Sequence, residues 1–226
     1  MDFTRKRITA AYVAPMAVFL GFLALNSLLK SVGRGFWLES AEFWIYPLQT
    51  IVCGAVLLFY KSEYAIALPR RIWIAMVVGV VVFVIWISPQ AFFGATARTS
   101  GYNPEIFADR LPLYWTNVVF RFARLVIVVP LIEEIFWRGF LLRYLISNDF
   151  VRVPFGSFSW PSFAVVAIAF MLTHALPDWP AALICGVLYN CVAYWTKSLT
   201  SCVVAHAATN LFLGLWIMQT RQWGFW

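Results

Sequence analysis

Long apolar segments are the feature of this 226-residue chain that most limits how it can fold. A helix of about 20 consecutive apolar residues crosses the hydrocarbon core of a bilayer, and 62% of this chain is apolar. Charged residues make up only 12% of it, about half of what a soluble domain carries. Too few charged side chains are therefore available to cover a surface that faces water. The composition excludes a soluble enzyme, a disordered chain and a nucleic-acid-binding domain, and it predicts a polytopic membrane protein.

Seven apolar segments are expected to form membrane helices. The segment 113–146 is too long for one perpendicular span, so we predict seven to eight transmembrane helices. No internal repeat or linker divides the chain, which predicts one all-α integral membrane domain over residues 1–226. The three spans within 1–112 carry no chemical signature, whereas 113–219 carries the candidate motifs. The seven segments cover residues 8–29, 43–60, 72–93, 113–146, 160–176, 181–195 and 199–219.

Six of the ionisable and amide side chains within these segments are the candidates for chemistry. A charge at mid-depth of the bilayer costs roughly 2.5–3.5 kcal/mol, so each such residue needs a partner or a function. Three of them lie in 113–146, one ends the next segment, and two lie in the last. They are Glu133, Glu134, Arg138, His174, His206 and Asn210.

The spacing of these residues predicts how they pair. Glu134 and Arg138 are four residues apart, so on a helix they share a face and can form an ion pair. Glu133 is rotated from Glu134 by about 100°, so it must be protonated or find a donor on another helix. His206 and Asn210 again share a face. Each feature alone suits a structural contact between helices, but together they favour one shared polar cavity within the membrane.

Two further features of the segment 113–146 affect its geometry. Arg121 and Arg124 precede its most apolar part and are expected near a membrane interface. Pro130 lies one turn before the two glutamates and is expected to disturb the helix, because proline cannot donate a backbone hydrogen bond.

Three motifs, in this order and on separate apolar segments, resemble the CPBP family. They are Glu133-Glu134-x-x-x-Arg138, Phe170-x-x-x-His174 and His206-x-x-x-Asn210. The CPBP family comprises the CAAX-processing and bacteriocin-processing intramembrane proteases and is also called the ABI family. The resemblance covers roughly residues 113–219, and a looser one points to the bacterial CAAX prenyl protease-related group.

The resemblance implies a role for each catalytic residue. Glu133 with His174 would activate a water molecule for attack on a peptide carbonyl, as a carboxylate beside an imidazole can do. His206 and Asn210 would stabilise the resulting oxyanion, a contribution of a few kcal/mol in other enzymes. No serine or cysteine nucleophile is implied.

The remaining motif residues and the metal alternative complete the predicted site. Glu134, held by Arg138, would shape the site, and no cofactor is expected. Glu133, His174 and His206 would make an acceptable zinc ligand set, so a metal-dependent variant stays open. The chain has no H-E-x-x-H motif, and the family resemblance favours the metal-free glutamate mechanism.

The predicted function is that of an intramembrane endopeptidase. Its partner would be a protein or peptide at the membrane, with a prenylated C-terminus or a leader peptide as the candidates, and we expect no nucleic acid partner. The expected location is the inner (plasma) membrane of a bacterium. One alternative is a non-catalytic scaffold or bacteriocin-immunity protein of the same fold. Another, a small transporter with a proton relay, lacks the inverted repeats typical of that class.

Overall fold

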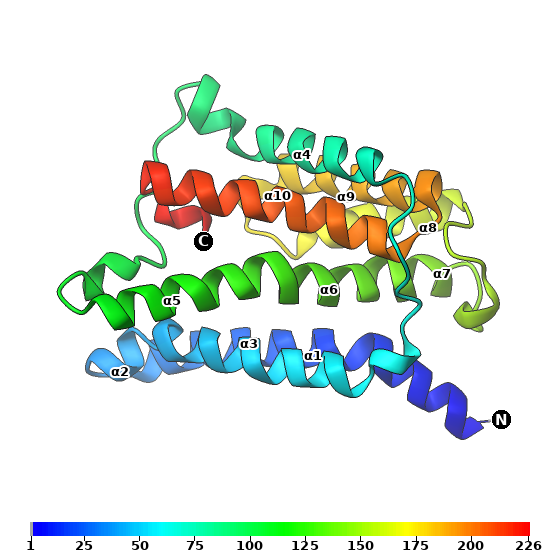
Figure 1. Cartoon of the computed structure of the whole chain (residues 1–226), viewed down its shortest axis with the longest axis horizontal. Coiled ribbons are helices and arrows are strands. Elements are labelled where there is room, and N and C mark those ends of the chain that lie inside the picture. The colour runs from blue at the N-terminus through cyan, green and yellow to red at the C-terminus, as the bar shows by residue number, and fades with distance from the viewer. Residues whose placement is uncertain (1) are drawn as a thin grey trace. The chain divides into compact units, whose positions relative to one another are not determined.

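The computed structural model describes residues 2–226, with side chains described from Arg5 onward. Every regular element in this part of the chain is a helix or helical turn, and no strand occurs in it (Figure 1). The predicted all-α class is therefore confirmed. The chain divides into two compact units. Unit 1 is Met1–Glu63, Arg98–Ile132 and Gly214–Trp226, and unit 2 is Tyr64–Ala97 and Glu133–Leu213.

Five helices in the described residues are long and apolar enough to cross a membrane. The predicted polytopic membrane class is confirmed, but two of the seven apolar segments are not uniform helices of that length. One is the 13-residue helix α8 (Trp160–Leu172), and the other is interrupted by irregular turns. The five belong to α1 (Asp2–Val32), α3 (Glu42–Phe59), α4 (Ile72–Phe92), α9 (Trp179–Thr196) and α10 (Leu199–Thr220).

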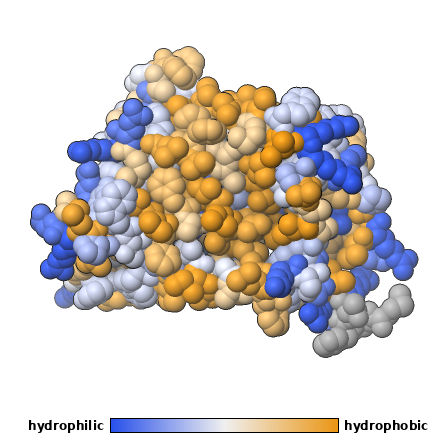
Figure 2. Space-filling model, in the orientation of Figure 1, coloured by the Kyte–Doolittle hydropathy of each residue, from blue (hydrophilic) through white to orange (hydrophobic). Residues whose placement is uncertain are grey.

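The outer surfaces of these helices are apolar along most of their length. On α4, Trp73, Val77 and Val84 are exposed, and on α10 Leu211 and Leu215 are exposed. Figure 2 shows hydrophobic side chains over the middle of the helices and hydrophilic ones toward the helix ends. Because a helix satisfies its own backbone hydrogen bonds, such an apolar surface suits lipid rather than water.

The segment predicted at 113–146 is a helical stretch with two wider, π-helical turns. These turns are Arg124–Val128 and Ile135–Leu141, and they separate α5 (Leu111–Ala123), α6 (Val129–Glu134) and α7 (Leu142–Tyr144). Pro130 has no N–H to donate to the carbonyl of Val126, four residues earlier. The first π-helical turn is therefore the backbone irregularity expected beside Pro130. Such turns inside α-helices frequently occur at functional sites.

Unit 1 is held together by α1, α3 and α5, with the four-residue helix α2 (Phe36–Glu39) joining the first two. Gln49 on α3 donates from Nε2 to the carbonyl of Phe19 on α1 at 2.9 Å, and Arg124 Nε donates to Gln49 Oε1 at 2.7 Å. Arg121 lies 5.0 Å from the centre of the Tyr46 ring. The two arginines expected near an interface are therefore buried among the helices of unit 1.

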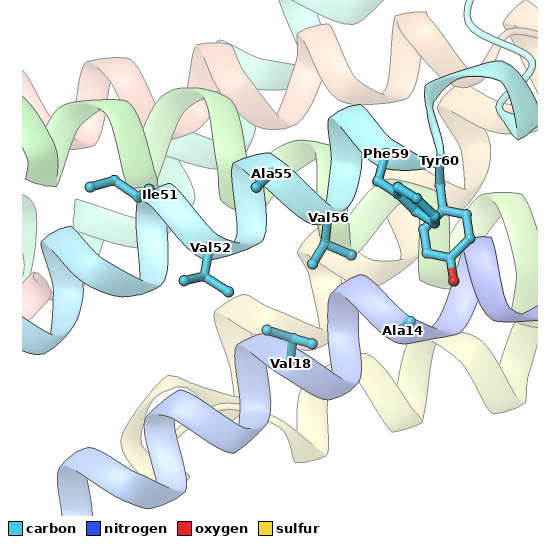
Figure 3. Close-up of a pocket in the computed structure, with 8 residues that line it drawn as sticks. All are labelled: Ala14, Val18, Ile51, Val52, Ala55, Val56, Phe59 and Tyr60. Carbon is cyan, nitrogen blue, oxygen red and sulfur yellow. The ribbon is translucent and has the colours of Figure 1, made fainter.

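A groove of about 560 Å³ lies between α1 and α3 in unit 1. Figure 3 shows Ala14 and Val18 of α1 facing Val52 and Val56 of α3, with the Tyr60 hydroxyl at one end. Apart from that hydroxyl, its side chains are apolar. The groove contains none of the residues predicted to carry chemistry, so it is distinct from the predicted polar cavity.

Unit 2 contains all of the predicted site residues and includes α4, α8, α9 and α10 as far as Leu213. α9 packs against both α8 and α4. Tyr189 on α9 donates to the Thr209 hydroxyl on α10 at 2.7 Å, and Thr209 donates to the carbonyl of Gly79 on α4 at 2.8 Å. A Cβ on Gly79 would lie 2.7 Å from the carbonyl oxygen of Ala205. Glycine therefore allows α4 and α10 to approach closely, as small residues do between membrane helices.

Candidate active site

Glu134 and Arg138 form a completely buried ion pair. Arg138 Nη1 lies 3.0 Å from Glu134 Oε1, and neither side chain is exposed. The pairing predicted from their four-residue spacing is confirmed. Arg138 lies in the second π-helical turn, and Glu134 is the last residue of α6 before it. The second π-helical turn therefore begins directly after one of the two charged residues and carries the other.

His206 of α10 joins this pair from another part of the sequence. Its Nδ1 lies 2.9 Å from Glu134 Oε1, the same oxygen that receives Arg138. Because an ionised carboxylate can only accept, this contact assigns the proton to Nδ1 and leaves Nε2 as the outward-facing nitrogen of the ring. The Tyr189 ring packs against the imidazole with 5.1 Å between the ring centres. The contact with Glu134 therefore sets the direction of the His206 ring, and the Tyr189 ring packs against one of its faces.

Arg138 has two further hydrogen bonds, both to α9. Its Nε donates to Asn190 Oδ1 at 3.1 Å, and its Nη2 donates to the carbonyl of Gly186 at 3.2 Å. The rings of Phe170 and Tyr189 lie 5.1 and 5.3 Å from the guanidinium carbon. The buried positive charge is therefore compensated by a carboxylate, two oxygen acceptors and two aromatic faces, as a charge removed from water requires.

His174 lies two residues beyond the end of α8, where it is half-buried. Its Nδ1 lies 2.9 Å from the carbonyl of Phe170, and its ring contacts the rings of Phe170 and Trp86 at 4.8 and 5.5 Å. The indole of Trp179 donates to the His174 carbonyl at 3.1 Å. A backbone carbonyl can only accept, so this contact also assigns the proton of His174 to Nδ1 and the free lone pair to Nε2.

Phe170 connects His174 to the charged pair. The same ring contacts the His174 imidazole at 4.8 Å and lies 5.1 Å from the guanidinium carbon of Arg138. The second motif of the sequence, Phe170-x-x-x-His174, therefore has a physical explanation. Its phenylalanine packs on the arginine and accepts the hydrogen bond of the histidine through its backbone.

Glu133 and Asn210 are placed differently from the other predicted residues. Glu133 is half-buried and makes no hydrogen bond or ion pair with any residue that the structure describes. The structure therefore does not join it to His174 directly. Asn210 is buried on α10, one turn after His206. The catalytic roles assigned to these two residues therefore stay predictions.

Asn190 and Trp86 are contacts that the motifs did not reveal. Asn190 is completely buried and bonds to Arg138, and Trp86 contacts His174 from α4. A strongly polar amide within the apolar α9 was a signal of some buried partner, although its identity could not be read from the sequence. Nothing distinguishes Trp86 in the sequence from the other tryptophans of the chain.

The structure does not assemble the alternative metal ligand set. Among residues 2–226, no three His, Cys, Asp or Glu side chains lie close enough together to hold a metal ion. Glu133, His174 and His206 therefore do not form a ligand cluster in this arrangement.

The comparisons with known proteins bear on the same stretch of the chain. Residues 115–212 match the family model described as type II CAAX prenyl endopeptidase, Rce1-like. Searches of curated proteins and of solved structures find no match. The matched family is one of membrane proteases whose substrates are membrane-associated proteins or peptides. The resemblance of the chain to the CPBP family is thus confirmed over residues 115–212, the stretch that contains every predicted site residue, as a similarity to the Rce1-like type II CAAX prenyl endopeptidases.

Proposed function

We propose that the protein is an intramembrane endopeptidase in which Glu133 and His174 activate a water molecule. The observation that carries this proposal is the buried carboxylate of Glu134, held by Arg138 and bonded to His206, within the segment that matches the protease family. A charged group at this depth is costly, so its retention with a histidine partner favours function over packing.

The two adjacent glutamates have different surroundings, which supports different roles. Both hydrogen-bonding partners of Glu134 share its Oε1, and its side chain is completely buried. Glu134 is therefore suited to hold the guanidinium of Arg138 and the ring of His206 in place. Glu133 is half-buried and has no bonded partner in the described chain, so it remains able to accept a proton from water. Two carboxylates in contrasting environments commonly divide their roles in this way.

The reactive nitrogen is Nε2 in both histidines, but the proposed roles of the two rings differ. In each, Nδ1 donates to a fixed oxygen, so Nε2 is the reactive atom. Beside Phe170 and Trp86, His174 can orient the water that Glu133 deprotonates. His206 is held by the Glu134 carboxylate through Nδ1, which leaves its Nε2 edge for contact with the oxyanion of the substrate.

The proposed reaction is hydrolysis through a tetrahedral intermediate. The water oxygen attacks the peptide carbonyl carbon while Glu133 takes one of its protons. The carbonyl oxygen becomes an oxyanion that accepts hydrogen bonds from His206 and the Asn210 amide. Glu133 then gives its proton to the leaving nitrogen, the C–N bond breaks, and a carboxylic acid and an amine are released.

The proposed substrate is a protein or peptide held at the membrane, processed at a CAAX-type C-terminus or at a leader peptide. This assignment is supported by the family match and by the membrane-spanning helices of the chain. The resemblance to the bacterial group supports a location in the bacterial inner membrane.

Cleavage of a peptide panel by the purified protein tests the proposal. The panel contains prenylated and unprenylated CAAX peptides and leader peptides, each assayed beside the variant Glu133→Gln. This variant keeps the size of the side chain but removes its ability to take a proton. We expect cleavage by the wild-type protein and none by the variant, with both proteins equally folded.

Each outcome of this assay has a clear meaning. Cleavage of prenylated peptides alone would assign CAAX-type processing, and cleavage of leader peptides alone would assign the other class. Identical cleavage by wild type and Glu133→Gln would remove Glu133 as the base. No cleavage of any peptide by either protein would favour the non-catalytic scaffold.

A further inference from the structure

Asn190 has both ends of its side-chain amide bonded inside unit 2. Its Oδ1 accepts from Arg138 Nε at 3.1 Å, and its Nδ2 donates to the carbonyl of Phe163 on α8 at 3.2 Å. The side chain is completely buried. These two contacts fix the orientation of the amide, because reversing it would place a donor against Arg138 and an acceptor against a carbonyl oxygen.

The guanidinium of Arg138 depends on this amide for its orientation. Nε donates to Asn190, Nη1 to Glu134 and Nη2 to the Gly186 carbonyl. Three different groups therefore set the plane of the guanidinium. Only Nη1 faces the carboxylate. If Nε lost its acceptor, a buried charged donor would be left unpaired, and the guanidinium would turn to satisfy it.

A rotation of the Arg138 guanidinium would affect His206 through Glu134. Glu134 Oε1 accepts from both Arg138 and His206, at 3.0 and 2.9 Å. A carboxylate released by Arg138 would move, and this changes the hydrogen bond at Nδ1 and the position of the imidazole ring. The three contacts in series run from Asn190 through Arg138 and Glu134 to His206.

We propose that Asn190 is a positioning residue. By orienting Arg138 toward Glu134, it sets the position of the His206 ring and the hydrogen bond at its Nδ1. It acts through other residues and touches no reacting atom. The effect on catalysis rests on the function proposed above, whereas the effect on the imidazole does not. The chain suits a direct test, because His174 and His206 are its only two histidines.

Nitrogen-15 NMR of histidine-labelled protein measures the state of each ring nitrogen. We compare wild type with Asn190→Leu, which keeps the size of the side chain but removes both hydrogen bonds, and assign the signals with His174→Gln. The expected result is a changed Nδ1 shift for His206 and an unchanged one for His174. Unchanged His206 shifts in folded Asn190→Leu protein would overturn the proposal.

A matched control and a conservative variant separate positioning from packing. Asn117 is a buried amide of unit 1 that bonds to Tyr102 and to the Leu113 carbonyl. Asn117→Leu should leave both histidines unchanged. Asn190→Asp keeps an oxygen for Arg138 Nε in the same volume, and if Asn190→Leu does not fold, the smaller Asn190→Ala replaces it as the variant without the acceptor. The His206 shifts of Asn190→Asp should stay near those of wild type, and a shift equal to that of the variant without the acceptor would contradict the proposal.

Cleavage kinetics supply the second readout. With an active substrate, Asn190→Leu should lower kcat by about tenfold to a hundredfold, as the loss of an outer partner does at other sites, with KM unchanged. A higher KM for the substrate with an unchanged kcat would overturn the positioning role of Asn190. If the NMR shift occurs but wild type cleaves nothing, the positioning stands and the proposed protease function fails.

Discussion

The substitution Arg138→Met tests how strongly unit 2 depends on its buried charges. Methionine fills much of the same volume but removes the three donors to Glu134, Asn190 and the Gly186 carbonyl. Glu134 would keep only His206 as a bonded partner. A buried carboxylate would thus lose its cation, with no water to replace it, since neither side chain is exposed.

The expected cost follows from the burial of both partners. Breaking a buried ion pair by removing one member costs about 3–5 kcal/mol. For a chain of this size, that corresponds to a decrease in Tm of about 6–20 °C. Glu134→Gln in the same protein removes the stranded charge, so the double variant should recover part of the loss. The expected coupling between the two positions is about 0.5–3 kcal/mol.

Thermal unfolding in detergent micelles, followed by tryptophan fluorescence, measures both effects. Wild type, the two single variants and the double variant form one thermodynamic cycle. The reasoning would be refuted if Arg138→Met lost less than about 1 kcal/mol, the range of an exposed ion pair. It would also be refuted if the double variant were less stable than Arg138→Met, because the stranded carboxylate would then not be the source of the cost.

Four further predictions concern catalysis and unit 1. Glu133→Gln and His174→Ala should each abolish cleavage while the Tm stays within a few degrees of wild type, and activity in either would remove that residue from the mechanism. Asn210→Ala should lower kcat by roughly 10²–10³ if its amide binds the oxyanion, whereas a negligible change would leave it a structural residue. A strong chelator should not change the cleavage rate, and a loss that zinc restores would contradict the metal-free mechanism. Gln49→Leu should destabilise the protein by about 1–3 kcal/mol in thermal unfolding, because it removes a buried acceptor from Arg124, and an unchanged Tm would contradict this.

The positions of the helices could be predicted closely from the sequence. The last apolar segment was expected at 199–219, and α10 is Leu199–Thr220. The third was expected at 72–93, and α4 is Ile72–Phe92. Such segments are predictable because the bilayer demands a minimum length of apolar residues and a helix that satisfies its own backbone. The Glu134–Arg138 pair was equally predictable, since both residues lie on one helix at a spacing that brings them together.

Contacts between helices were not predictable in the same way. The bond between Glu134 and His206 joins residues 72 positions apart, and nothing in the local pattern selects this glutamate over Glu133 as the partner. Asn190 was visible as a polar residue in an apolar helix, but such an amide can bond to any neighbour. The π-helical turns at Arg124–Val128 and Ile135–Leu141 also have no simple sequence signal beyond Pro130. Their position depends on which carbonyls find other partners after folding.

The division of roles between the adjacent glutamates depends on these unpredicted contacts. The sequence places Glu133 and Glu134 about 100° apart on a helix, and the four-residue spacing selects Glu134 as the partner of Arg138, but only tertiary structure decides which of the two receives His206. Because Arg138 and His206 both bind Glu134, that carboxylate is occupied and its neighbour is left without a bonded partner in the described chain. The fixed glutamate thereby holds an imidazole in one orientation, and the proposed mechanism assigns the proton exchange with water to the other. Two adjacent glutamates thus have different surroundings because one arginine four residues later and one histidine on α10 both bind the second of them.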